Sequence, residues 1–193
     1  MGAEEKSAPK GCEDPFHDGE GVVLLHQGLD EDKVKRPAGG IGQDHEIPSN
    51  TGRQRINING AIDCAGLCPI TRYDDTINAQ STVALLQQIE QQHPAAAHIY
   101  VICDNARYYR SQIVTEYLLD SKIELIFLPP DAPNLNLIER YWRFFKKEIL
   151  YGKYYETFAL FKQACDTFFA ASARYKDALR SLLTDNFQII GCA

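Results

Sequence analysis

The sequence contains no apolar run of the roughly 18 residues that a membrane-spanning helix requires. Its start, Met1 to Lys10, is polar and charged and lacks the apolar stretch of a signal peptide. Its cysteines lack zinc-site spacing, since Cys64 and Cys68 have no second pair downstream. We therefore expect a cytoplasmic protein with no membrane partner.

The sequence also lacks a surplus of basic residues: 20 Lys and Arg stand against 26 Asp and Glu, a formal net charge of −6. Residues 1–50 carry 11 acidic and 5 basic residues, whereas residues 51–193 carry 15 of each. Proteins that bind DNA are usually more basic. If this chain binds DNA, we expect a local patch, or the loss of a separate binding domain.

What is present suits one soluble α/β domain: 193 residues, of which 45% are hydrophobic and 24% charged. Eight of the 13 glycines fall within residues 1–45, where only Gly21 to Leu25 has a strand pattern. Regular periodicity begins near Glu46. We therefore divide the chain into a divergent segment, 1–45, which holds a first strand, and a main domain, 46–193.

The main domain reads as alternating strands and helices. Arg53 to Ile62 alternates with period two, which predicts a half-buried strand. The further strands are predicted at Arg72–Ile77, His98–Cys103 and Glu124–Leu128, and the further helices at Asn78–Gln92, Tyr108–Leu119, Tyr155–Ala171 and Tyr175–Leu183. This order predicts a mixed sheet flanked by helices, with a parallel crossover between the last two strands.

The clearest helix follows the rigid Pro129-Pro130 turn. Its apolar residues recur at i, i+3, i+7, i+10 and i+14, which predicts one buried stripe: Leu135, Ile138, Trp142, Phe145 and Ile149.

Two carboxylates stand at informative places. Asp104 follows a predicted buried strand, and Glu139 lies beside the apolar stripe 35 positions later, with 34 residues between them (139 − 104 − 1). A carboxylate at a strand end and another at a helix start suit a two-metal phosphoryl-transfer site. Local interpretations are also open, since Asp104 can make a turn and Asn136 with Glu139 has capping-box spacing.

Basic residues also accompany these carboxylates. Arg140, Arg143 and Lys147 form a stripe at i, i+3 and i+7 of the same helix. Either DNA phosphates or solvent can face such a stripe. We extend the DNA-binding hypothesis to Arg53, Arg55 and Arg107.

Two motifs, read together, resemble the DDE transposases of the mariner superfamily. The motifs are Ile102-Cys103-Asp104-Asn105-Ala106-Arg107 and Leu128-Pro129-Pro130-Asp131-Ala132-Pro133, the latter leading to Leu137-Ile138-Glu139-Arg140. The bacterial insertion-sequence six-thirty branch is the most similar, including its gap of 34 residues between aspartate and glutamate.

This resemblance implies a ribonuclease H-like fold with a mixed five-stranded sheet. It also implies two Mg²⁺ ions, replaceable by Mn²⁺, held by a triad that includes Asp104 and Glu139. The expected reaction is cleavage and strand transfer at terminal inverted repeats in double-stranded DNA, with a homodimer as the expected assembly.

The sequence departs from the family at the first aspartate of the triad. No carboxylate is in register after Gly21 to Leu25, and Asp30 is the nearest substitute. A frameshift or decay of the coding sequence between residues 24 and 42 is our hypothesis for this departure. From the length of this sequence before the first strand, we also expect the helix-turn-helix region of full-length members to be absent. Three functions therefore stay open: a truncated transposase, a catalytically inactive remnant that binds DNA or protein, and another ribonuclease H-like nuclease.

Overall fold

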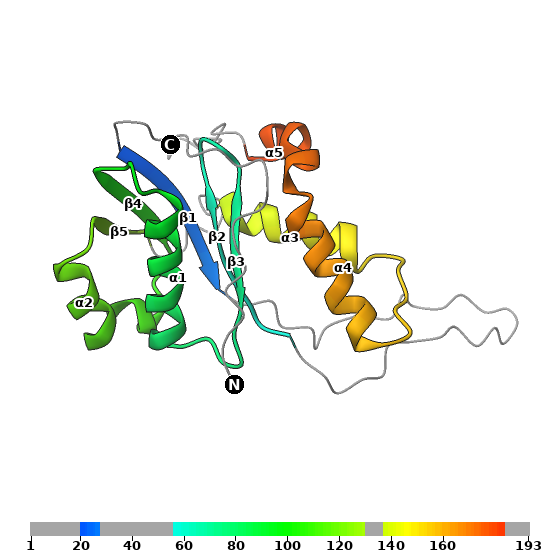
Figure 1. The fold of residues 1–193 in the computed structure, drawn as a ribbon, viewed down its shortest axis with the longest axis horizontal. Coiled ribbons are helices and arrows are strands. Elements are labelled where there is room, and N and C mark those ends of the chain that lie inside the picture. Colours follow the sequence, from blue (N-terminus) through cyan, green and yellow to red (C-terminus); the bar gives the residue numbers. More distant parts are fainter. Residues whose placement is uncertain (1–19, 28–55, 130–136, 184–193) are drawn as a thin grey trace, which may run out of the picture.

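The fold is built on a five-stranded mixed sheet with strand order β3-β2-β1-β4-β5 (Figure 1). The computed structural model describes residues 20–27, 56–129 and 137–183. β1 (Glu20–Gln27) lies at the centre, antiparallel to β2 (Ile58–Asp63) and parallel to β4 (His98–Cys103). β5 (Ile123–Phe127) continues the parallel half, which confirms the predicted parallel pairing.

One predicted strand was misplaced. The sequence pattern suggested Arg72–Ile77, but β3 covers Pro69–Tyr73 and pairs antiparallel with β2. The strand ends where the Arg72 guanidinium binds the Asp74 carboxylate, with Nε 2.9 Å from both carboxylate oxygens. The Asn78 side chain then caps the next helix. Asp75 therefore lies in the connection between the strand and that helix, outside the sheet.

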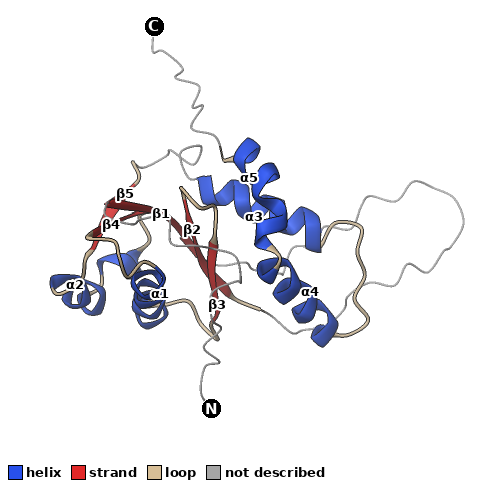
Figure 2. Ribbon diagram, turned by 45° about the horizontal axis from the view of Figure 1, so that its top comes forward, coloured by secondary structure: helices blue, strands red, loops and turns tan. Residues whose placement is uncertain are grey.

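In the part of the chain that the structure describes, five α-helices cover the two faces of the sheet (Figure 2). α1 (Ala79–Gln92) and α2 (Gln112–Leu119) lie on one face. α3 (Leu137–Ile149), α4 (Phe158–Ala170) and α5 (Lys176–Leu182) lie on the other. Within the described ranges, no helix is long and apolar enough to cross a membrane.

The helix predicted at Tyr108–Leu119 is divided in two. A 3₁₀ turn, Arg107–Arg110, comes first, and α2 starts only after Ser111, whose hydroxyl accepts the Val114 amide at 3.5 Å. Ser111 itself is extended, so it interrupts the helical hydrogen bonds and caps the second piece. The predicted start at Tyr155 likewise moves to Phe158, because Thr157 caps α4.

β2 is buried on both faces, so the prediction of a half-buried strand was wrong. Ile58 and Ile62 belong to the core shared with α3, and Ala61 belongs to the core shared with α1. Asn59 is also fully buried, and its amide donates to the Ser81 carbonyl at 3.4 Å. A central strand between two helical layers has no solvent face, whatever its polar residues suggest.

The predicted stripe on α3 is confirmed for its four described members, Ile138, Trp142, Phe145 and Ile149, which are all buried; Leu135 lies outside the described residues. Trp142 packs directly on Gly60 of β2, where a Cβ atom would lie 2.9 Å from the indole Cζ2. The close approach of helix and sheet therefore requires glycine at position 60.

We predict that Gly60→Ala destabilises the fold by about 1–3 kcal/mol, the usual cost of overpacking a core. Trp142→Phe removes the ring atoms that clash with the new methyl group. In urea unfolding, the double variant is therefore expected to be more stable than the sum of the two single changes. Simple additivity of the two effects would contradict the packing described here.

A polar cluster fastens α1 to the connection between α2 and β5. Glu90 accepts hydrogen bonds from Ser121 Oγ at 2.7 Å, from the Lys122 amide at 3.0 Å and from the Tyr117 hydroxyl. Burial raises the pKa of Glu90, but these hydrogen bonds together outweigh it and hold the pKa below its ordinary value. The charged form of Glu90 therefore stabilises the folded state.

Because its folded pKa is lowered, Glu90 contributes stability that is complete above the ordinary glutamate pKa of about 4.3. That contribution is lost as pH falls through the folded value. We expect Glu90→Gln to lower the free energy of unfolding at pH 7 and to flatten its decline in acid, measured by urea titration. Glu116→Gln, at an exposed site on α2, is the control and should keep the wild-type acid profile.

Candidate active site

Asp104 directly follows β4, at the end of a strand as predicted. It is partly buried, and its Oδ1 accepts the Ala106 amide at 3.0 Å. This is a turn of the kind that aspartate favours. It is not a helix cap, because the following 3₁₀ turn has no side-chain cap. The turn fixes the position of the carboxylate at the end of the strand.

Glu139 lies in the first turn of α3 and is also partly buried. Its neighbour Ile138 packs in the same apolar cluster as Ile102 of β4, which lies two residues before Asp104. Figure 1 shows the N-terminal end of α3 near β1 and β2, and α3 contacts β1. The segments that carry Asp104 and Glu139 therefore adjoin the same apolar cluster. Asn136, the proposed partner of a capping box, lies outside the described residues.

The end of β1 borders the same place. The parallel register pairs Leu24 of β1 with Ile102 of β4, so β1 runs on toward Asp104. Asp30, the substitute for the first aspartate, lies beyond β1 and outside the described residues. Among the residues that the structure describes, no three acidic, histidine or cysteine side chains are grouped as a metal site.

A hydrogen-bond network around Asn105 was not found from the sequence. Its amide donates to the Leu128 carbonyl at 2.6 Å, and its Oδ1 accepts from Arg110 at 2.9 Å. The Arg110 guanidinium also lies over the Phe127 ring, 4.2 Å from its centre. The network joins the turn after β4 to the end of β5, where the segment that leads to Glu139 begins. The Asp-Asn pair was its only sequence signal.

The Asp104 carboxylate also acts on its neighbours electrostatically. Burial first and the Asp104 charge second raise the pKa of the Cys103 thiol to about 12. The same two causes raise the pKa of the Tyr108 hydroxyl. Both groups are therefore neutral at physiological pH, and neither competes with Asp104 for a cation.

The predicted DNA-binding residues occupy different settings. Arg107, Arg143 and Lys147 are exposed. Arg140 is partly buried, and its guanidinium donates to the Leu182 carbonyl of α5 at 3.3 Å. Arg53 and Arg55 lie outside the described residues.

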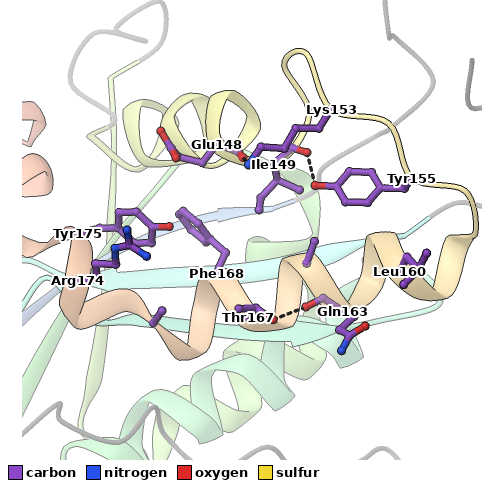
Figure 3. A pocket seen from close by; sticks show the side chains of 12 residues that line it. Glu148, Ile149, Lys153, Tyr155, Leu160, Gln163, Thr167, Phe168, Arg174 and Tyr175 are labelled. Carbon is purple, nitrogen blue, oxygen red and sulfur yellow. Dashed lines mark hydrogen bonds between the residues drawn. The ribbon is translucent and has the colours of Figure 1, made fainter. Parts of the chain in front are cut away.

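A separate hollow of about 370 Å³ lies at the far end of α3 (Figure 3). Glu148 and Ile149 of α3, Tyr155 of the following loop and Phe168 of α4 line it. It contains neither Asp104 nor Glu139, so it is not part of the candidate active site.

The sheet order and the two helical layers are those of the ribonuclease H-like fold. The sequence family described as DDE superfamily endonuclease matches residues 27–162, more than two thirds of the chain. The chain therefore belongs to the DDE endonuclease superfamily, as its resemblance to this group implied.

Solved structures of transposases share the fold. The Mos1 mariner paired-end complex with Mn matches with a TM-score of 0.57 and 17% identity, over 84% of this chain and 52% of that one. The catalytic domain of Mos1 transposase matches with a TM-score of 0.56 and 14% identity, over 84% and 76%. A simian T-cell lymphotropic virus intasome chain matches with a TM-score of 0.54 and 10% identity, over 86% and 54%.

This chain thus spans about half the length of the Mos1 chain in the paired-end complex. No curated protein sequence matches it significantly.

We predict that Asn105→Ala loosens the segment after β5, because the variant leaves the Leu128 carbonyl without its amide donor. The expected result is faster hydrogen exchange at the Leu128 amide, which bonds to Cys103, and a loss of about 1 kcal/mol in stability. Arg107→Ala, exposed in the same turn, is the matched control. Equal exchange in the two variants would show that the Asn105 bridge does not hold this segment.

Proposed function

We propose that this chain is the catalytic domain of a mariner-type transposase of the insertion-sequence six-thirty branch. It cleaves DNA at terminal inverted repeats with Mg²⁺ as cofactor and joins the freed 3′ end to a target. Three observations support it: Asp104 directly follows β4, Glu139 lies in the first turn of α3, and Ile102 of β4 packs against the apolar cluster that contains Ile138 of α3. The proposed setting is the cytoplasm, with two copies on a pair of ends.

The donors present suit the proposed metal. Carboxylate oxygens are the hard ligands that Mg²⁺ and Mn²⁺ prefer. Asp104 is held by its own turn, and Glu139 stands on a helix anchored by the buried Ile138 and Trp142. When bound, two such ions would activate the attacking water or 3′-hydroxyl and stabilise the leaving oxygen. Asp30 is the proposed third ligand.

The protein side chains have distinct tasks in this proposal. Asp104 and Glu139 supply the negative charge that holds cations against the DNA phosphate. Asn105 positions the start of the segment that leads to Glu139. Arg107, Arg143 and Lys147 are exposed and face phosphates, and Arg140 contributes from its place against α5. Arg53 and Arg55 are proposed as further phosphate contacts.

A catalytically inactive remnant is the second candidate. The observation that favours it is that the sequence has no carboxylate in register after Gly21 to Leu25, where the family has its first aspartate. In that case the domain acts at most as a binding module for DNA or protein.

The test is nicking of a labelled duplex that ends in the terminal repeat of the source element, with Mg²⁺, Mn²⁺ or EDTA. We expect metal-dependent nicking that falls by at least a hundredfold in Asp104→Asn and in Glu139→Gln, since loss of a metal ligand removes the charge that holds the ion. Asp177→Asn, a fully exposed carboxylate on α5, should keep wild-type activity.

Three results would revise the proposal. Wild-type protein that binds the duplex and does not nick it in either metal supports the remnant. Preference for an RNA–DNA hybrid supports another ribonuclease H-like nuclease. Undiminished nicking by Asp104→Asn shows that the site is wrongly placed.

A further inference from the structure

We propose that the solvent face of α3 and the loop after it form a track for single-stranded DNA. Arg143 and Lys147 contact the phosphates, and Tyr151 and Tyr154 stack on the bases. The inference rests on the proposed function, since such a strand would be the one freed next to the cleavage site.

The cationic part of the track lies on the helix surface opposite the core. Arg143 lies four residues, and Lys147 eight, beyond Glu139, so both are on successive turns that lead away from it. Both side chains are exposed. At 1.5 Å per residue, the track from Glu139 to Lys147 is about 12 Å long, a span of about two to four nucleotides.

The aromatic part continues from the end of the helix. Tyr151 is 67% exposed and Tyr154 52% exposed, so both rings are accessible to a base. Tyr151 lies in the turn that follows α3, four positions after Lys147 and two after the last residue of the helix. Gly152, with a φ of +68°, turns the chain here, a conformation that glycine adopts without strain.

The tyrosines of the loop differ in orientation. Tyr155 points inward: its hydroxyl donates to the Ile149 carbonyl at 2.6 Å, and its ring packs edge-on against Phe161 (Figure 3). This anchor holds the loop against α4. Tyr151 and Tyr154 on the same short loop are therefore presented outward on a fixed support.

The positive charges and the aromatic rings of the track together indicate which form of DNA binds it. The helix dipole alone would explain a lysine in the last turn, but it does not explain two exposed rings beside it. Bases in a duplex are already stacked, whereas an unpaired strand gains stacking energy on exposed tyrosines and neutralises its phosphates on the cations. The succession of two cations and two exposed rings therefore fits a single strand better than a duplex.

The experiment measures fluorescence anisotropy of labelled dT12 with the full chain in EDTA, so that no metal at Asp104 or Glu139 contributes. We expect the Tyr151→Ala/Tyr154→Ala variant to bind on the order of tenfold more weakly than wild type. Tyr151→Phe/Tyr154→Phe should bind like wild type, because stacking needs only the ring. Leu119→Ala, 78% exposed at the end of α2, is the control for a general loss of exposed apolar surface.

A second variant tests the cations. Arg143→Ala/Lys147→Ala should lower the slope of log affinity against log salt by about 1.4, since each phosphate contact on a single strand contributes about 0.7. Circular dichroism melts check that all variants are folded. The inference is overturned if wild type does not bind dT12, or if the double alanine variant at the tyrosines binds it as wild type does.

The two proposals fail separately. Tyrosine-dependent binding of dT12 without any nicking contradicts the proposed nuclease and leaves the track intact. If the protein nicks DNA in a metal-dependent way but binds dT12 equally well without Tyr151 and Tyr154, the track is contradicted and the proposed nuclease function stands.

Discussion

The packing of α3 on the sheet is the contact on which the site depends. Trp142 lies against Gly60, and Ile138 shares an apolar cluster with Ile102 of β4. Burial of these side chains removes a large apolar area from water, which is the main favourable contribution to folding. The same contact sets the height and direction of the helix. The first turn of α3, which carries Glu139, is therefore held against the sheet by residues that take no part in the proposed chemistry.

The sequence predicted most of the elements, because hydrophobic periodicity reflects burial directly. The strand His98–Cys103 was predicted with its observed bounds, and the stripe through Trp142 and Phe145 is buried. The errors in the predicted elements arose at single polar side chains, which affected the bounds of a helix and the predicted burial of a strand. Ser111 divides a helix by capping its second half. Asn59 looked like a solvent-facing residue, yet it is buried, because both faces of β2 are covered.

The motif residues of the candidate site could be predicted from the sequence, but the contacts that hold their segments in place could not. Asp104 and Glu139 stood out because two short motifs occur in order and at family spacing. The bridge from Asn105 to Leu128 joins residues 23 positions apart. That contact depends on how β4 and β5 pair, and a local sequence pattern does not predict strand pairing. Asp30 lies outside the described residues, so its role as third ligand stays a prediction.

The central claim is that Asp104 and Glu139 together hold a catalytic metal. The most direct measurement is anomalous X-ray scattering from crystals of this chain grown with MnCl₂. We expect a manganese peak within coordination distance of an oxygen of Asp104 and an oxygen of Glu139, and its loss in Asp104→Asn. Manganese bound elsewhere, or no peak beside either carboxylate in a well-ordered site, would contradict the claim.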